Sequence, residues 1–510
     1  MTDFINLGDL IPRERDLDKV AIIDLGGEAG ARAFTYRQID DMARGVARAL
    51  LKRGLTRGDR VAIHSANRAE YLAAVCGIMR AGLVAVPVNF KFPRETIDFI
   101  IKDSDANFVF CDAVRRADVP NGVTAITFSE EFDAFLDAGP FDTVQPAPRE
   151  PAMFLYTSGS TGIPKGVVLS HQSHLWVIEA RLTQDISRHR FLVAAPLYHM
   201  NGLAVSQLVC AGHATLVLLP QFTAASYIDA AERYRCTWLT AVPPMIAMML
   251  READRMANAD LSSVDFVRMG SAPVSESLMA SLKGAIPRAA ITNAYGTTEG
   301  GPVVFGPHPK GLRQPELSVG YPHPDVQTRL VDSDGREGDY GALQMKSPAV
   351  MNGYHNRPDI LTPITADGFY RTGDVFRRDD NGFHFFVGRV DDMFVSGGEN
   401  IYPSDVERML ERHPDIVQAT VVPIEDDIKG QKPVAFVIAK EGAPLNEDAV
   451  KQYALKHAPA YQHPRFVWFV EKMPLSSTNK VDRTALKRDA EARLRIPPPP
   501  RGRGLGGGPS

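Results

Sequence analysis

Residues 156–167, YTSGSTGIPKGV, carry the densest set of groups that can bind phosphate. Their glycines let backbone N–H groups turn toward anionic oxygens. The hydroxyls of Ser158, Ser160 and Thr161 can donate further hydrogen bonds, and Lys165 can supply a charge worth about 4 kcal/mol at contact. The spacing differs from the GxxxxGK[ST] of a P-loop. Taken alone, the segment is equally compatible with a flexible surface turn.

Residues 293–299, NAYGTTE, combine a flat ring with oxygen ligands. Tyr295 offers a face on which a base can stack. Thr298 and Glu299 offer a hydroxyl and a carboxylate of the kind that Mg²⁺ prefers. A strand end followed by a helix cap would use the same residue types, so this segment is weak evidence when it stands alone.

Two later segments add charged groups of both signs. Residues 370–374, YRTGD, end in Asp374, whose carboxylate can accept from both hydroxyls of a ribose, and Arg389 downstream can pair with phosphate or ribose oxygens. Residues 474–483, PLSSTNKVDR, place Lys480 in a polar turn before a helical run. Each has an ordinary alternative: an aspartate in a β-turn, a surface arginine and an exposed lysine.

The elements that must position these residues alternate through the first three hundred positions. Residues 35–54 predict an amphipathic helix, because apolar residues recur at helical spacing and Thr35 with Gln38 forms a capping box. Short apolar runs such as FLVAA, ATLVLL and TWLTAV then follow, separated by helix-length stretches. This alternation predicts mostly parallel sheets covered by helices.

The chain is predicted to be an α/β protein with a large N-terminal and a small C-terminal domain. Short strands with turn residues begin near residue 320 and predict an antiparallel β subdomain. The expected N-terminal domain is residues 1–390, made of about 1–150 and 151–320 (α/β) and 321–390 (β). The expected mobile α+β domain is 391–490, with helices near 404–412 and 447–457, and the tail 491–510 is expected to be disordered.

The bulk composition excludes several classes of partner. The net charge is −4, so no overall positive field invites nucleic acid or an anionic membrane. The segment CGIMRAGLVAVPV is too short and too interrupted to span a membrane, and the N-terminus has no signal-peptide pattern. Four cysteines without metal spacing predict buried thiols in a reducing cytoplasm. A homodimer is compatible with the sequence.

Taken together and in this order, the four segments resemble the adenylate-forming superfamily, which holds acyl-CoA synthetases, peptide-synthetase adenylation domains and beetle luciferases. The resemblance runs from FTYRQI at Phe34 to Lys480. It implies ATP, Mg²⁺ and coenzyme A as cofactors, an active site between the two domains, and a hinge at Asp391 in GRVDD. The implied reaction adenylates a carboxylic acid and passes the acyl group to the CoA thiol.

The resemblance also assigns roles residue by residue. The implied ATP- and AMP-binding residues are Thr157, Ser158, Gly159, Ser160, Thr161, Gly162, Lys165, Gly270, Ser271, Ala272, Tyr295, Gly296, Thr297, Thr298, Asp374 and Arg389. Thr298 and Glu299 would serve Mg²⁺, and Lys480 would bridge the substrate carboxylate and the α-phosphate. The family often has Thr at position 160 and Gly at position 479, where this chain has Ser160 and Asn479.

The acyl pocket is implied by PLYHMNG, residues 196–202, with His199 as its gate. The implied pocket residues are His199, Met200, Asn201 and Gly296. This segment has no aspartate for a substrate ammonium, and residues 289–308, PLYHMNG and GSAP contain no Lys or Arg. The sequence therefore predicts an uncharged aryl or alkyl tail on the acid.

The C-terminal domain is expected to present SGGENIYPSDVE, residues 396–407, when it turns. Gly397 and Gly398 would form a narrow passage for pantetheine, although an ordinary glycine turn before a helix capped by Ser404 would look the same. Two other functions remain open from the sequence: an adenylation enzyme that loads a carrier protein, and a catalytically idle relative. The retained Lys165 and Lys480, with Glu299 and Asp374, speak against the idle relative.

Overall fold

The computed structural model describes residues 4–27, 30–158, 163–360, 362–476 and 480–495. The chain divides into two compact units, and the division falls between Val390 and Asp391. The first unit is Met1–Val390 with Ser477–Lys480, and the second is Asp391–Ser476 with Val481–Ser510.

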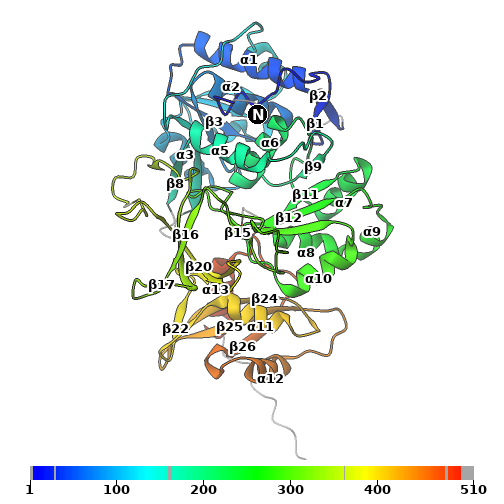
Figure 1. The fold of residues 1–510 in the computed structure, drawn as a ribbon, viewed down its shortest axis with the longest axis vertical. Helices are drawn as coiled ribbons and strands as arrows, with labels where there is room; N and C mark the ends of the chain where they lie inside the picture. The colour runs from blue at the N-terminus through cyan, green and yellow to red at the C-terminus, as the bar shows by residue number, and fades with distance from the viewer. Residues whose placement is uncertain (1–3, 28–29, 159–162, 361, 477–479, 496–510) are drawn as a thin grey trace, which may run out of the picture. The chain divides into compact units, whose positions relative to one another are not determined.

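One sheet of the first unit runs in the order β13-β12-β11-β9-β10-β1-β2 and is parallel except for the β1–β2 pair. Its middle strands are short buried apolar runs, as expected for a parallel sheet covered on both faces. Helices α7 to α10 lie beside β11 and β12 (Figure 1). The bounds are β1 Val20–Asp24, β2 Arg32–Thr35, β9 Arg190–Val193, α6 Met200–Ala211, β10 Thr215–Leu218, α7 Ala224–Arg233, β11 Trp238–Ala241, α8 Pro243–Arg251, α9 Ala253–Asn258, β12 Phe266–Gly270, α10 Glu276–Ala285 and β13 Ala290–Ala294.

A second sheet runs in the order β19-β8-β7-β4-β3-β5-β6. It is parallel from β7 to β6, whereas β8 is antiparallel to both β7 and β19. The bounds are α1 Tyr36–Lys52, β3 Arg60–His64, α2 Ala69–Arg80, β4 Val84–Pro87, α3 Arg94–Asp103, β5 Phe108–Cys111, β6 Thr124–Thr127, α4 Glu130–Phe135, β7 Pro151–Ser158, β8 Pro164–Ser170, α5 His171–Arg181 and β19 Gly353–Tyr354, with a 3-10 turn at Ala113–Asp118.

The two sheets do not divide the chain at residue 150, where the sequence predicts a subdomain boundary. Strand β1 pairs with β10, and β2 pairs with β1, in the sheet built mainly from later residues. Strands β7 and β8, which follow residue 150, join β4 in the sheet built from earlier ones. Local patterns reveal where strands occur, but pairing across nearly two hundred residues has no local signal.

The expected β character after residue 320 is confirmed. An antiparallel sheet runs in the order β17-β16-β18-β20-β21, and β14 pairs with β15 beside it. Alternate residues of β18 are buried, as in a sheet with one face on a core. The bounds are β14 Phe305–Gly306, β15 Tyr321–Pro322, β16 Gln327–Val331, β17 Glu337–Gly338, β18 Tyr340–Lys346, β20 Tyr370–Arg378 and β21 His384–Arg389.

The second unit has the expected α+β composition. Its sheet runs β23-β22-β25-β24, with β26 parallel to β25. The bounds are β22 Phe394–Ser396, β23 Glu399–Ile401, α11 Pro403–Glu411, β24 Ile416–Asp426, β25 Gly430–Ala439, α12 Glu447–His457, β26 Phe466–Phe469 and α13 Arg483–Arg495, with a 3-10 turn at Ala460–Gln462.

The helix expected near 404–412 is present as α11, Pro403–Glu411. Tyr402 stands at its N-cap position without a side-chain hydrogen bond, and Ser404 already lies in the first turn after Pro403. Residues 491–495 belong to α13 rather than to a tail. The rest of the expected disordered tail, 496–510, lies outside the described residues.

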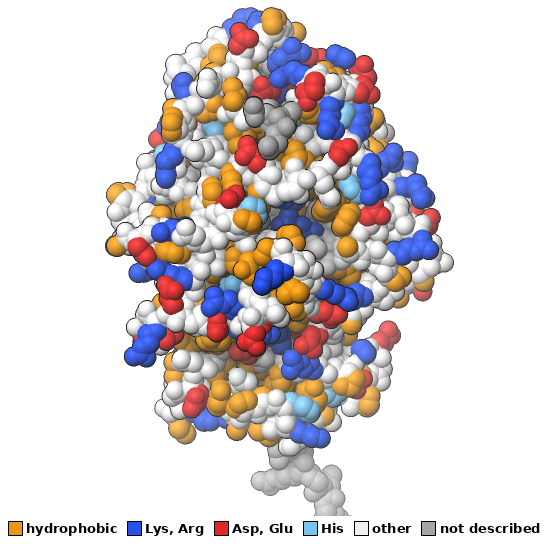
Figure 2. Space-filling model, in the orientation of Figure 1, with side chains coloured by type: hydrophobic (Ala, Val, Ile, Leu, Met, Phe, Trp, Pro, Cys, Tyr) orange, Lys and Arg blue, Asp and Glu red, His pale blue; other side chains and the backbone are white. Residues whose placement is uncertain are grey.

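The predicted first helix is confirmed in detail. Thr35 caps α1 by accepting from the Gln38 backbone, and the Gln38 side chain accepts from the Thr35 N–H at 2.8 Å. In the part of the chain that the structure describes, no helix is long and apolar enough to cross a membrane. Over the face drawn in Figure 2, basic and acidic side chains are interspersed, consistent with the small net charge.

Helices α1 and α2 approach closely at Gly77, and we expect Gly77→Ala to lower the thermal unfolding midpoint. An added Cβ would lie 2.5 Å from the Ala43 carbonyl oxygen and 2.7 Å from Val46 Cβ. Overpacking of this kind costs about 1–3 kcal/mol. Gly284→Ala in α10 is the control, because its Cβ would meet nothing within 4 Å. Equal midpoints for the two variants would contradict the close packing.

Candidate active site

The predicted adenine-binding segments follow two neighbouring parallel strands. Gly270 at the end of β12 pairs with Ala294 at the end of β13, so Ser271 and Tyr295 leave the sheet at the same edge. A Cβ on Gly270 would lie 2.9 Å from the Ala294 carbonyl oxygen. Ser271 has φ +67°, a left-handed conformation that non-glycine residues rarely adopt. Ligands of open α/β sheets bind at this carboxyl edge.

Asp374 is a buried carboxylate, only 4% exposed, and it links three elements. It accepts a hydrogen bond from the Tyr295 hydroxyl and lies 3.2 Å from Arg389 Nη1. Asp374 and Arg389 are direct partners in the register of β20 and β21. Burial and the nearby Asp374 charge raise the pKa of Tyr295. The structure therefore brings together three residues that the sequence places up to ninety-four positions apart.

Glu299 lies in a second cluster with Lys165. The Tyr354 hydroxyl donates to Glu299 Oε1 at 3.3 Å, and Lys165 Nζ lies 5.5 Å from the centroid of the same tyrosine ring. Burial raises the pKa of Glu299, while Tyr354 and the charges of Arg389 and Lys165 oppose that rise. Sequence reasoning missed Tyr354, because only the pairing of β19 with β8 brings it here.

The structure describes only part of the predicted phosphate-binding segment. Thr157 and Lys165 are direct partners across the antiparallel strands β7 and β8, and Ser158 is the last residue of β7. The predicted residues Gly159, Ser160, Thr161 and Gly162 lie outside the described residues.

His199 and Met200 open helix α6, and Asn201 follows in its first turn. Burial, and then the charges of Lys480 and Lys91, lower the pKa of His199 to about 3, so its ring is neutral near pH 7. Within the described residues its Nε2 is buried without a hydrogen-bond partner. The sulfur of Met200 lies 3.3 Å from His174 Nε2.

By its contacts, Lys480 belongs to the first unit, which also contains Asp374 and Arg389. Desolvation by the surrounding protein lowers the pKa of the Lys480 ammonium. The negative charge of Asp374 raises this pKa, and the positive charge of Arg389 lowers it further. The neighbouring Asn479 lies outside the described residues.

Gly397 and Gly398 form the two-residue loop of a β-hairpin. Ser396 pairs with Glu399 across β22 and β23, and the two glycines have φ +62° and +89°. Such a loop needs positive φ at both positions. The hairpin turn therefore explains both glycines, whether or not a thiol passes them.

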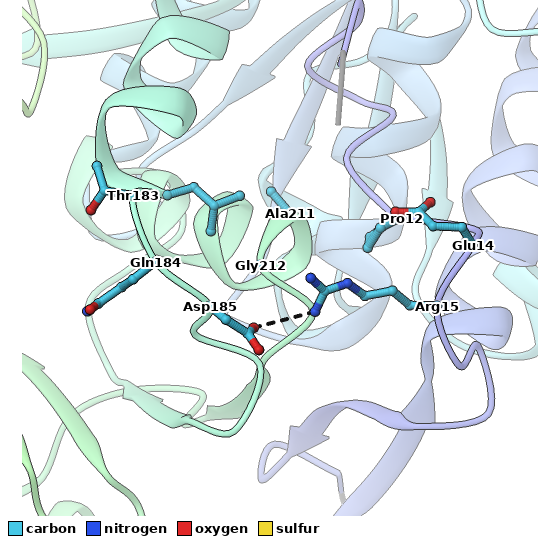
Figure 3. A pocket seen from close by; sticks show the side chains of 9 residues that line it. Pro12, Glu14, Arg15, Thr183, Gln184, Asp185, Ala211 and Gly212 are labelled. Atoms are coloured by element: carbon cyan, nitrogen blue, oxygen red, sulfur yellow. Dashed lines mark hydrogen bonds and ion pairs between the residues drawn. The ribbon is translucent and has the colours of Figure 1, made fainter. Parts of the chain in front are cut away.

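A pocket of about 470 Å³ lies elsewhere in the first unit. It opens between the N-terminal segment at Pro12–Arg15 and the ends of α5 and α6 (Figure 3). Arg15 and Asp185 approach to 3.5 Å at its rim. None of the predicted site residues lines it, so it carries none of the chemistry considered above.

Comparison with known proteins gives consistent matches over nearly the whole chain. A family model described as AMP-binding enzyme matches residues 12–355, and one described as AMP-binding enzyme C-terminal domain matches residues 405–480. A sulfoacetate–CoA ligase of Cupriavidus necator is 30% identical over 482 residues, covering 90% of this chain and 93% of that protein. An indoleacetate–CoA ligase of Aromatoleum aromaticum is 32% identical over 476 residues, covering 88% and 92%.

Solved structures agree with these matches. The crystal structure of ATP-bound MatB from Rhodopseudomonas palustris superposes with a TM-score of 0.87 at 27% identity, covering 96% of this chain and 99% of that one.

The low pKa of His199 predicts a stability loss on acidification. The unfolded chain binds a proton at this residue below about pH 6.5, whereas the folded chain does so only near pH 3. The contribution of neutral His199 to the free energy of unfolding is therefore fully present above pH 6.5 and declines as the pH falls toward 3. In His199→Gln, we expect the fall in unfolding midpoint between pH 7.5 and 5 to shrink by the equivalent of about 1–2 kcal/mol.

Thermal unfolding followed by circular dichroism at the two pH values measures this difference. The control is His457→Gln on α12, an exposed histidine whose Nδ1 contacts the Tyr453 carbonyl. If His199→Gln loses as much stability on acidification as the wild type, His199 is not held neutral by the fold.

Proposed function

The chain belongs to the AMP-binding enzyme family, in its acyl- and aryl-CoA ligase branch, and we propose how its residues carry out the reaction. The enzyme is an AMP-forming acid–CoA ligase. A carboxylate attacks the α-phosphorus of ATP and pyrophosphate leaves. The CoA thiol then attacks the carbonyl carbon of the acyl-AMP, a thioester forms, and AMP leaves.

The nucleotide is proposed to bind at the carboxyl edge of β12 and β13. Residues 270–272 and Tyr295 would flank adenine, with Gly296 and Thr297 continuing the same wall. Asp374 would accept from the ribose hydroxyls, with Arg389 beside it. The observation that carries this assignment is the buried carboxylate of Asp374 held by Tyr295 and Arg389 at that edge.

The phosphates are proposed to lie along the turn between β7 and β8. Thr157 and Lys165 face one another where that turn begins and ends, so their hydroxyl and ammonium can reach the same anion. Glu299 and Tyr354 border Lys165. These contacts support a proposal in which Lys165 is the cation for the phosphates and Glu299 is a nearby carboxylate for a metal.

The residues present fit a Mg²⁺ ion that arrives with ATP. Mg²⁺ usually binds through one or two carboxylates plus substrate phosphates. Glu299 supplies one carboxylate and Thr298 a hydroxyl, and the described residues contain no group of three or more His, Cys, Asp or Glu that would hold a metal alone. A bound Mg²⁺ would offset the phosphate charge. Its positive charge would also favour the ionised form of Glu299, which burial disfavours.

Lys480 is proposed to stabilise the charge that develops on the α-phosphate. A cation aimed at a developing charge in a water-poor site lowers the barrier without reorganising during the reaction. The neutral His199 would gate the acyl pocket rather than transfer a proton, because a ring with pKa about 3 is a very weak base near pH 7.

The second half-reaction is proposed to use the second unit. Gly397 and Gly398 would form the passage for pantetheine, and rotation at Asp391 would present it. The division of the chain between Val390 and Asp391 supports a hinge at this position. We also propose a cytoplasmic enzyme, in which Cys76, Cys111, Cys210 and Cys236 stay as free thiols.

Removal of the Lys480 ammonium should block adenylation selectively. We expect Lys480→Ala to lower ATP–pyrophosphate exchange by about 10²–10³-fold while sparing transfer from preformed acyl-AMP to CoA. Lys472→Ala, which removes an exposed lysine eight residues earlier, is the matched control. Full pyrophosphate exchange in the Lys480 variant would remove this residue from the mechanism.

Fixing the backbone at the proposed hinge should separate the two half-reactions. Proline holds φ near −65°, so Asp391→Pro should form acyl-AMP but make hardly any thioester. Pyrophosphate exchange and thioester formation are measured on one sample, with Asp391→Ala as the control for loss of the side chain. Equal losses in both steps would indicate damage to the fold, and wild-type rates in both would place the hinge elsewhere.

A further inference from the structure

Two arginines of the first unit, Arg181 and Arg268, lie close enough for their charges to interact, and the described residues provide neither with an acidic partner. Arg181 ends helix α5, and Arg268 stands in β12 two residues before Gly270. Burial lowers the pKa of both side chains, that of Arg268 to about 10, and the Arg268 charge lowers the pKa of Arg181 further. Among the described residues, neither guanidinium lies within 4 Å of a carboxylate.

Arg268 borders one of the segments assigned to the acyl pocket. Its Nη2 lies 3.5 Å from the carbonyl oxygen of Pro302. The backbone of Pro302 in turn packs against Gly296, where an added Cβ would lie only 2.6 Å from Pro302 Cα. Pro302 therefore contacts both the guanidinium of Arg268 and the backbone of Gly296.

Arg181 continues a face of α5 that reaches the other acyl-pocket segment. His174, seven residues earlier, contacts the sulfur of Met200 at 3.3 Å. Val177, four residues before Arg181, packs with Val303, the neighbour of Pro302. Residues spaced by three, four and seven share a helix face. This face of α5 therefore extends from His174, which contacts Met200, to Arg181. Between them it packs on Val303, the neighbour of the Pro302 that Arg268 contacts.

The arginine pair is unfavourable in the fold as it stands. Both residues are half-buried. Arginines withdrawn from water are normally paired with an acid, and two like charges brought together repel. The carboxyl end of a helix favours a cation and accounts for part of the position of Arg181. It does not account for Arg268, which lies in a strand. An anionic group of a ligand would supply the missing partner for both.

We propose that Arg181 and Arg268 bind a second anionic group of the acid substrate, a carboxylate or a sulfonate, at the end opposite the carboxylate that is adenylated. The planar fork of a guanidinium matches the oxygens of either group. This inference rests on the proposed placement of the acyl pocket at Met200 and Gly296.

The sequence predicts an uncharged tail because residues 289–308, PLYHMNG and GSAP contain no Lys or Arg. Arg181 and Arg268 lie outside all three segments. The fold brings Arg268 next to Pro302 of the first segment, and it puts Arg181 on the face of α5 whose His174 contacts Met200 of the second. The preferred acid is therefore one with charge at both ends rather than a fatty or simple aromatic acid.

The test compares matched acids with the full-length wild-type enzyme. CoA-dependent AMP release is measured with short dicarboxylic acids, with sulfonate-bearing acids of equal length, and with the monomethyl ester of each dicarboxylic acid. We expect the best doubly charged acid to exceed its uncharged-tail counterpart in kcat/KM by about 10²-fold or more, because loss of one partner of a buried charge pair has an effect of this size. A preference for the esters would overturn the proposal.

Two variants assign that preference to the arginines. Arg268→Met and Arg181→Met should each lower kcat/KM for the doubly charged acid by about 30- to 10³-fold, and leave the ester within about threefold because it never used the charge. The ester activity also shows that each variant is folded. Arg268→Lys should recover part of the loss.

The matched control is Arg251→Met. Arg251 ends helix α8 as Arg181 ends α5, and burial also lowers its pKa. This variant should keep the wild-type ratio between charged and uncharged acids. Equal losses for both acids in the Arg181 and Arg268 variants would mean a structural role and overturn the proposal. Activity with esters alone would overturn the anion site but leave the ligase function intact, whereas no CoA-dependent AMP release with any acid would overturn both.

Discussion

A carboxylate that folding buries needs hydrogen-bond partners, and Asp374 is such a carboxylate in this protein. The side chain is only 4% exposed, and its oxygens meet the hydroxyl of Tyr295 and the guanidinium of Arg389. Tyr295 follows the parallel strand β13, whereas Asp374 and Arg389 lie in the antiparallel strands β20 and β21. One charged group thereby fixes the β subdomain against the edge of the parallel sheet, where the nucleotide is proposed to bind.

Features set by neighbouring residues could be predicted from the sequence. The capping box of Thr35 and Gln38 and the helix at 447–457 need only local spacing, and both are present. The strand partners could not be predicted. Strands β1 and β2 join a sheet formed mainly by residues after 190. The pairing of β1 with β10 is fixed by packing rather than by any nearby signal. For the same reason a boundary at residue 150 fitted the pattern but not the sheets.

The site shows the same division between local and tertiary information. Tyr295, Asp374 and Arg389 were predicted from residue type and order, and the fold brings them into contact. Tyr354 carries no motif, and it reaches Glu299 only because β19 pairs with β8. The two arginines proposed to select the acid come from a helix end and a strand interior, so a search confined to motif segments overlooks them. The part of the chain that sets substrate choice is thus the least visible in sequence.

The most direct test of acyl-adenylate chemistry is the fate of the carboxylate oxygens. An acid labelled with ¹⁸O in its carboxylate would attack the α-phosphorus through one labelled oxygen. Thiol attack on the acyl carbon would then leave that oxygen on the released AMP. The account predicts AMP carrying one ¹⁸O and unlabelled pyrophosphate by mass spectrometry. Unlabelled AMP, or label in inorganic phosphate released with ADP, would contradict it.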